Sequence, residues 1–265
     1  MLNLFRVEWL KIRTYKTFWI LFGTFCVMFP IAFYFSASKY MENKNGIQEE
    51  TIKAFLGSPF IFPKVWHSAS WFGGMFFVMM GMLFILLITN EVQYRTHRQN
   101  IIDGWSRLDF LKAKFSLLIF FVLVSTLLVF ISALAVGYIF SKNTSSPFEN
   151  MYYLWYFMLM ATIYLMVAYL VAILVKRTGL SVIIYFAVVC IIDNLLWLIL
   201  TLYNNQFGYF LPLEAGDSLI VNPFKPAIME KRTVSDMALI ATGLGYIVLF
   251  AFIIIRYFKR SDLKT

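Results

Sequence analysis

The chain has 265 residues, of which 61% are hydrophobic, 19% aromatic and only 14% charged, and its formal net charge is +9. A soluble domain is nearer one half apolar and one quarter charged, so most of this chain must lie in lipid. No stretch is left for a soluble nucleotide-binding domain. The only two cysteines, Cys26 and Cys190, both fall in apolar runs, which excludes a disulfide framework.

Residues 1–17 predict a short amphipathic helix. At helical spacing Leu2, Phe5, Trp9 and Ile12 share one face, with arginines at its edge. Such a helix is suited to the membrane interface; the alternative is an ordinary basic flank that only sets orientation. The candidate functional positions on this helix are Phe5, Glu8, Trp9, Lys11 and Ile12.

Six apolar runs long enough to cross a bilayer follow this helix. They cover residues 18–36, 71–90, 115–140, 153–175, 180–203 and 237–255. The first run could also be a secretory signal peptide, because Ser36-Ala37-Ser38 resembles a cleavage site, but it is too long and too aromatic for a typical one. The predicted fold class is an all-α integral membrane protein, with residues 1–265 forming a single transmembrane domain.

Lys and Arg are distributed unequally between the two sides of the membrane. Counting along the alternating spans places fifteen of the 23 on the side with both termini, the 91–114 loop and the 176–179 turn. The positive-inside rule makes that side cytoplasmic. Orientation and contact with anionic lipid therefore explain the excess positive charge, and no nucleic-acid partner is needed.

The 91–114 segment predicts a helix, a sharp turn and a second helix. The second span is expected to run on past Glu91 and to end at Gly104, a residue suited to helix termination. Ser106 with Asp109 three residues on resembles a capping box that opens the helix of the third span. We interpret the segment as a defined elbow that can transmit a push; the alternative is a solvated basic loop that fixes topology.

Sites for covalent chemistry are missing from the sequence. It contains no P-loop, no H-E-x-x-H and no G-x-S-x-G pattern. Its two histidines, His67 and His97, lie on opposite sides of the predicted membrane, so neither a metal site nor a bis-histidine haem is expected. We predict that the chain has no catalytic residue and no cofactor of its own.

The N-terminal segment FRVEWLKIRTYKTFW, the six spans and the loop EVQYRTHRQNIIDGWSR together resemble the membrane subunit of type-2 ABC exporters. The most specific part is Glu91, the Arg95-Thr96 pair, Gly104 with the Ser106-Arg107 turn, and Lys114. The resemblance implies that residues 1–17 form a connecting helix and that residues 94–103 form a coupling helix seated on an ATPase. It also implies re-entrant helices in the extracytoplasmic loop 204–236.

The family analogy further implies a transporter of two permease chains, as a homodimer or heterodimer, and two soluble ABC ATPase chains that bind ATP and Mg²⁺. It places this chain in the cytoplasmic membrane of a bacterium. The residues assigned to ATPase coupling are Glu91, Tyr94, Arg95, Thr96, Arg98, Asn100, Ile101, Ser106 and Arg107.

One acidic residue, Asp193, lies near the middle of the fifth span and is followed by Asn194. A central Asp costs about 2.5–3.5 kcal/mol on insertion scales, and the apolar runs hold no Lys or Arg to pair with it. Asp193 and Asn194 are therefore candidates for the translocation path or a subunit interface. The alternative is that Asp193 is a protonated or hydrogen-bonded packing residue.

The predicted function is ATP-driven export through a permease that performs no covalent chemistry. Two other classes stay open. One is an ion- or proton-driven secondary transporter with Asp193 as its coupling carboxylate, and the other is a membrane subunit that anchors partners and moves nothing.

Overall fold

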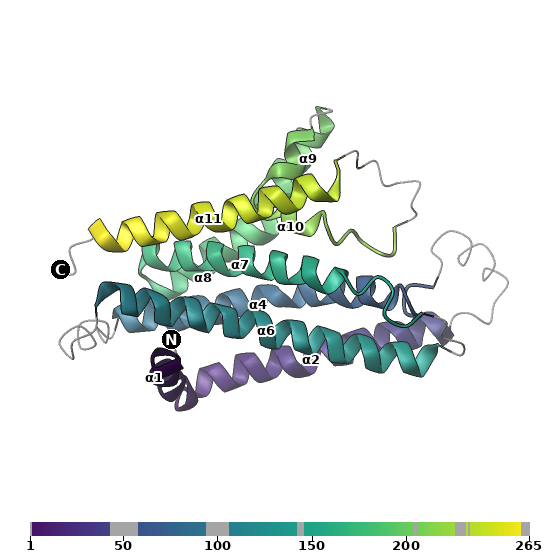
Figure 1. Ribbon diagram of the computed structural model, residues 1–265, viewed down its shortest axis with the longest axis horizontal. Helices are drawn as coiled ribbons and strands as arrows, with labels where there is room; N and C mark the ends of the chain where they lie inside the picture. Colours follow the sequence, from purple (N-terminus) through teal and green to yellow (C-terminus); the bar gives the residue numbers. More distant parts are fainter. Residues whose placement is uncertain are drawn as a thin grey trace.

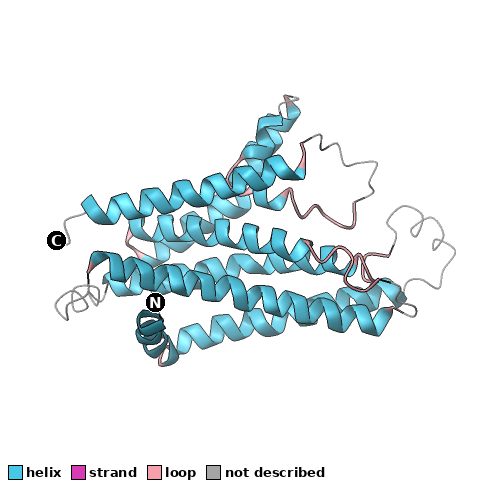
Figure 2. Cartoon of the chain, viewed as in Figure 1, coloured by secondary structure: helices cyan, strands magenta, loops and turns pink. Residues whose placement is uncertain are grey.

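The computed structural model describes residues 2–42, 58–93, 106–141, 146–203, 206–225, 232 and 234–260. Within these ranges every regular element is a helix or a helical turn, and none is a strand (Figure 2). Six helical segments are long and apolar enough to span a membrane, which confirms the predicted fold class. They are α2 (Lys16–Glu42), α4 (Val65–Gln93), α6 (Arg107–Phe140), α7 (Tyr153–Val175), the run of α8 (Thr178–Ala187), η2 (Val188–Ile192) and α9 (Asp193–Leu202), and α11 (Asp236–Arg260).

Most spanning helices are longer than the apolar runs from which they were predicted. Helix α2 continues to Glu42, where Lys39 forms an ion pair with Glu42 at 3.1 Å, and α4 begins at Val65 rather than at residue 71. A helix satisfies its own backbone hydrogen bonds, so it does not have to stop where the apolar sequence stops. Loops read from hydropathy alone are correspondingly too long.

Helix α7 lies at the centre of the bundle and packs against α4, α6, α8 and α11 (Figure 1). Its side chains are mostly buried, and those of α4 are buried to a similar degree. The segments α8–α9 and α11 expose most of their apolar side chains, as expected for helices that face lipid or another apolar surface. Figure 1 shows α9 diverging from the bundle and the N- and C-termini at the same end of it.

Helix α1 (Leu2–Arg13) is separated from α2 by a turn at Thr14-Tyr15 and packs on α6 and α2 at the end of the bundle with the termini (Figure 1). The rings of Phe5 and Trp9 lie 5.4 and 5.5 Å from the ring of Phe120. This contact fixes which face of α1 turns toward the bundle.

The chain between α9 and α11 folds back against the bundle. It contains a 3₁₀ turn, η3 (Gln206–Phe210), and a one-turn helix, α10 (Glu214–Asp217). Helix α10 packs against α7, and a Cβ on Gly216 would lie only 3.1 Å from the Cα of Met160. Because Met160 and its neighbour Tyr164 are near the middle of α7, α10 lies beside the middle of that helix rather than beyond its end.

A glycine also sets the distance between α4 and α8. A Cβ on Gly81 would overlap the ring and hydroxyl of the fully buried Tyr185. The absence of a side chain at Gly81 therefore lets the aromatic ring seat directly on the α4 backbone.

Replacing Gly81 with Ala should force α4 and α8 apart and lower the free energy of unfolding by about 1–3 kcal/mol, as overpacking does in other cores. The effect is measured as a lower melting temperature in detergent. Gly245→Ala is the matched control, because nothing lies within 4 Å of the added methyl group there. Equal melting temperatures for the two variants would contradict this packing.

Candidate functional site

A buried cluster of four charged residues joins three helices at the end of the bundle with the termini. The Lys114 Nζ of α6 lies 2.5 Å from Glu8 Oε2 of α1 and 2.7 Å from Glu91 Oε1 of α4. Lys11, also on α1, completes the cluster at 3.2 Å from Glu8 and 3.4 Å from Glu91. The side chains of Lys114 and Glu8 are each only 1% exposed. We call these four residues the ionic cluster.

The charges of the ionic cluster compensate one another, which is what permits their burial. Burial opposes ionisation of Glu8, but the ammonium groups of Lys114 and Lys11 outweigh it and hold the pKa of Glu8 below its ordinary value. The Lys114 ammonium also lies 5.2 Å from the centre of the Phe110 ring, which favours a cation at that point.

The last turn of α4 has further polar contacts. The Asn90 side chain donates to the Tyr15 hydroxyl at 2.7 Å, and the Thr178 hydroxyl donates to the Gln93 side chain at 3.3 Å. Together with Glu91, these contacts tie the end of α4 to α1, α6 and the start of α8.

The ionic cluster lies beside the segment that we predicted to be an elbow. The predicted capping box is confirmed: the Asp109 N–H donates to Ser106 Oγ at 3.1 Å, and the Ser106 N–H donates to Asp109 Oδ2 at 3.2 Å. Glu91 is in α4, and Arg107 is the first residue of α6. The other predicted coupling residues, Tyr94, Arg95, Thr96, Arg98, Asn100 and Ile101, lie outside the described residues.

The second helix expected within 91–114 is present, because the capping box starts α6 at Arg107 and residues 107–114 are helical. One expectation about this region needs correction. The spans are not free of basic residues, since Lys114 lies in a candidate span, 108–140. A lysine is tolerated there because two carboxylates from other helices neutralise and hydrogen-bond it, and the sequence pattern of α6 alone does not show this.

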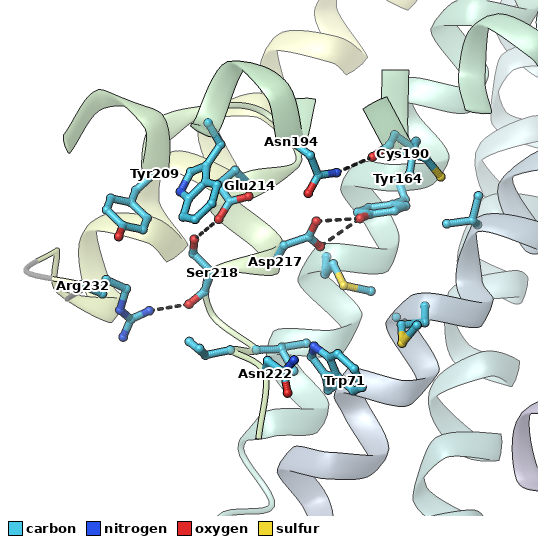
Figure 3. A pocket seen from close by; sticks show the side chains of 18 of the residues that line it. Trp71, Tyr164, Cys190, Asn194, Tyr209, Glu214, Asp217, Ser218, Asn222 and Arg232 are labelled. Carbon is cyan, nitrogen blue, oxygen red and sulfur yellow. Dashed lines mark hydrogen bonds between the residues drawn. The ribbon is translucent and has the colours of Figure 1, made fainter. Parts of the chain in front are cut away.

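A cavity of about 620 Å³ lies between α4, α7, η2, α9, α10 and the chain that follows α10 (Figure 3). Trp71, Met75 and Val78 of α4 contribute apolar wall, and Trp197 and Tyr209 contribute further aromatic surface. Among the polar groups that line the cavity are Asn194, Glu214, Asp217, Ser218, Asn222, Lys225 and Arg232. A space of this size with apolar walls and a few polar groups has the character of a small-molecule site.

Two carboxyl groups of α10 face this cavity, and each is bound by a hydroxyl. Glu214 Oε1 accepts a hydrogen bond from Ser218 at 2.6 Å, and Asp217 accepts from the Tyr164 hydroxyl, whose oxygen lies 2.7 and 2.9 Å from the two carboxylate oxygens (Figure 3). Burial, with a smaller contribution from the nearby carboxyl of Asp193, raises the pKa of Glu214 to about 8 and that of Asp217 to about 7.

Asp193, which we predicted on the translocation path or a subunit interface, is 6% exposed and accepts hydrogen bonds from the backbone N–H groups of Leu213 and Glu214. These are donors at the start of α10 that no intrahelical carbonyl satisfies. The geometry therefore gives Asp193 a structural contact, as in the packing alternative. Asn194 lines the cavity and donates to the Val189 carbonyl at 3.1 Å.

From the sequence we named Glu8, Lys11, Glu91 and Lys114 separately but did not predict that they meet, and we did not predict the acidic pair Glu214 and Asp217. Glu8 lies on the same side of α1 as Phe5 and Ile12, so an acid on an apolar face was the available signal. Glu214 and Asp217 are three residues apart, a spacing that puts them on one side of a helical turn, but the turn itself was not predicted.

Residues 4–194 match the family model described as ABC-2 family transporter protein. This chain belongs to the ABC-2 family. The matched range includes all four residues of the ionic cluster and ends at Asn194, before α10. No curated protein matches the sequence significantly.

Membership of the ABC-2 family makes this chain a multi-pass membrane protein and the permease component of an ABC transporter, and it implies an ATPase partner. In this family the membrane component is the permease and is not itself catalytic. The sequence contains none of the hydrolase or nucleotide-binding motifs named above.

Replacing Lys114 with Met should leave the carboxylates of Glu8 and Glu91 with only the partly exposed Lys11 as counter-charge. We expect the free energy of unfolding to fall by up to about 3–5 kcal/mol. Lys112→Met on the same helix is the control, because Lys112 is 53% exposed and its pairing with Asp109, at 3.9 Å, is worth less than about 1 kcal/mol. The measurement is melting temperature in detergent.

Adding Glu8→Gln to Lys114→Met should recover part of the lost stability, because it removes one of the buried carboxylates. If the Lys114→Met and Lys112→Met variants have the same melting temperature, the ionic cluster does not stabilise the packing of the three helices.

Replacing Asp193 with Ala should leave the first amides of α10 unsatisfied and destabilise the protein by about 1–3 kcal/mol. Asp193→Asn keeps one acceptor oxygen and should cost less. Asn194→Ala is the neighbouring control, since the hydrogen bond that its side chain donates, to the Val189 carbonyl, lies within its own helical segment. Cleavage of residues 206–225 by an added protease, compared among the three variants, reports whether α10 is released.

Proposed function

We propose that this chain is the stand-alone permease subunit of a bacterial ABC exporter. It couples ATP hydrolysis on a separate ATPase chain to the movement of a substrate across the cytoplasmic membrane. The ABC-2 family match supports the permease role. Because the sequence has no P-loop, ATP and Mg²⁺ are held by the ATPase, two copies of which serve two permease chains.

The ionic cluster is the observation that carries the proposed coupling role. It binds α1 to the end of α4 and to the start of α6, the two helices that flank residues 94–105. A displacement of residues 94–105 would therefore be transmitted to α4, α6 and α1 together. Rigid elements with buried, complementary contacts transmit displacement, whereas independently mobile helix ends dissipate it.

The proposed orientation puts this end of the bundle in the cytoplasm. The ends of α4 and α11 and the starts of α1 and α6 lie at the same end in Figure 1. That end also carries the larger share of the 23 Lys and Arg residues, which supports a cytoplasmic assignment. The ATPase would bind there, with α1 in the membrane interface.

The opposite half of the bundle would hold the re-entrant segment that we expected between the fifth and sixth spans. The contact between Gly216 and Met160 supports this, because it brings α10 to the middle of α7. In this arrangement η3 and α10 enter the membrane from the outside and return without crossing it.

An ion- or proton-driven transporter is a weaker proposal. It rests on Asp193, and the hydrogen bonds of that carboxylate with two backbone amides of α10 serve to anchor a short helix. ATP-driven export needs no additional role for Asp193.

The first experiment is gentle purification of the chain from native membranes, followed by mass spectrometry of the proteins that co-elute. A stoichiometric soluble chain with a P-loop supports the proposal. A chain that elutes alone in several mild detergents, together with transport that needs a proton gradient and no ATP, would overturn it. A chain that binds partners but has no transport activity in vesicles would be an anchor.

Replacing Arg98 with Glu should abolish at least nine tenths of the ATPase stimulation that the permease gives its partner in reconstituted vesicles, because the reversed charge opposes docking. Lys39→Glu is the matched charge reversal at the opposite end of the bundle, where the side chain is 75% exposed, and it should leave stimulation unchanged. Normal stimulation by the Arg98 variant would remove residues 94–105 from the ATPase contact.

A further inference from the structure

The side of the cavity formed by α10 carries carboxyl groups that none of the described basic side chains neutralises. Glu214 and Asp217 both line it, and Asp193, the first residue of α9, accepts hydrogen bonds from the backbone at the start of α10. Among the residues that the structure describes, none of these three carboxyls has an ion pair with Lys or Arg. This differs from the ionic cluster at the other end of the bundle, where each acid is paired.

The basic groups at the cavity do not cancel this acidity. Arg232 is held by the Ser218 carbonyl, at 2.5 Å, and by the carboxylate of Asp236, which neutralises it. Lys225 is exposed, and it lowers the pKa of Glu214 less than burial raises it. The region of the cavity nearest Glu214 and Asp217 therefore favours a positive charge.

Each of the two carboxyls still has acceptor capacity. The hydroxyl of Ser218 supplies one hydrogen to Glu214, and the hydroxyl of Tyr164 supplies one hydrogen to Asp217. An ionised carboxylate has about four acceptor positions, so a ligand can still interact with both groups.

The remaining walls are aromatic and apolar. Trp71 and Trp197 expose indole surface, and Met75, Val78 and Met160 add aliphatic and thioether surface. Tryptophan rings attract organic cations through the negative face of the ring, by about 0.5–2 kcal/mol per contact. At about 620 Å³ the cavity is large enough for a drug-sized molecule.

We propose that this cavity binds a lipophilic organic cation, with its positive charge beside Glu214 and Asp217 and its apolar body against Trp71, Met75 and Trp197. The inference rests on the proposed function in naming the class of cargo that the permease would export. Binding itself requires neither ATP nor the ATPase, so it can be tested separately.

Tetraphenylphosphonium is a suitable probe, and tetraphenylborate is an anion of nearly the same shape. Binding of labelled tetraphenylphosphonium to the purified full-length chain in detergent is measured by scintillation proximity, with tetraphenylborate as competitor. The cation should bind at least tenfold more tightly than the anion. Equal affinity, or preference for the borate, would overturn the proposal, and preference for the borate would point to an anion site at Lys225 and Arg232.

The double variant Glu214→Gln/Asp217→Asn should weaken tetraphenylphosphonium binding at least tenfold. The matched control, Glu42→Gln/Glu149→Gln, removes two exposed acids and should leave it unchanged. Unaltered binding by the α10 variant would overturn the assignment of the site.

The pH dependence of the wild-type chain gives an independent test if the α10 variant does not fold. Protonated Glu214 and Asp217 are neutral, so affinity for the cation should be weak at pH 6 and should rise at least fivefold by pH 9, as groups with pKa values of about 7 and 8 ionise. The other titratable or charged groups around them are Asp193, Tyr164, Tyr185, Cys190, Tyr209, Lys225, Arg232 and Asp236. A flat profile would count against the acidic pair.

The two proposals fail in different ways. If the purified chain binds the cation but no ATPase co-elutes with it from native membranes and transport needs no ATP, ABC export is overturned and this inference stands. ATPase stimulation with no selectivity for the cation would leave the permease role intact and remove this cargo class.

Discussion

The arrangement of one end of the bundle depends on one contact. It joins the ammonium group of Lys114 to the carboxylates of Glu8 and Glu91. A lone lysine at that depth among packed helices would be strongly disfavoured, and so would either carboxylate. Brought together they form a compensated group with Lys11, and the three helices that supply them must stay in register to keep it so. The high cost of separating the charges makes the arrangement specific, even where its net contribution to stability is modest.

The opposite half of the bundle uses carboxylates differently. There Asp193 binds backbone amides of α10, and Glu214 and Asp217 accept from uncharged hydroxyls. These acids are stabilised by hydrogen bonds rather than by ion pairs with Lys or Arg. The structure thus combines a neutralised ionic cluster at one end with an acidic cavity beside the middle of α7.

The two regions are connected by α4 and α7, which form the buried centre of the molecule. Helix α4 carries Trp71, Met75 and Val78 to the cavity and Glu91 to the ionic cluster. Gly81, between them, keeps α4 in direct contact with Tyr185 of α8. A displacement of the end of α4 that bears Glu91 therefore has a packed route to the cavity wall, as the coupling that we propose would require.

The helical class, the six spans and the place where α6 begins follow from the sequence itself. Runs of apolar residues can lie in lipid only as helices that satisfy their own backbone, and the Ser106–Asp109 capping box is a local interaction between residues three apart. The resemblance of the 91–114 segment to type-2 ABC exporters was also readable, and the family match agrees with it. The predicted ends of the helices were less accurate, because α2 and α4 continue into polar flanking residues that a hydropathy pattern leaves outside the spans.

Only the tertiary structure decided the partners of the charged residues. Glu8 and Lys114 are 106 positions apart, so no local pattern reveals that they meet. Asp193 has no basic neighbour in the sequence, and its partners turn out to be backbone amides of a helix too short to predict. The sequence determined that the chain is a helical membrane protein with its positive charge on one side, because hydropathy and charge act locally. Which charges are neutralised and which line a cavity depends on contacts between distant segments, and the fold alone brings those together.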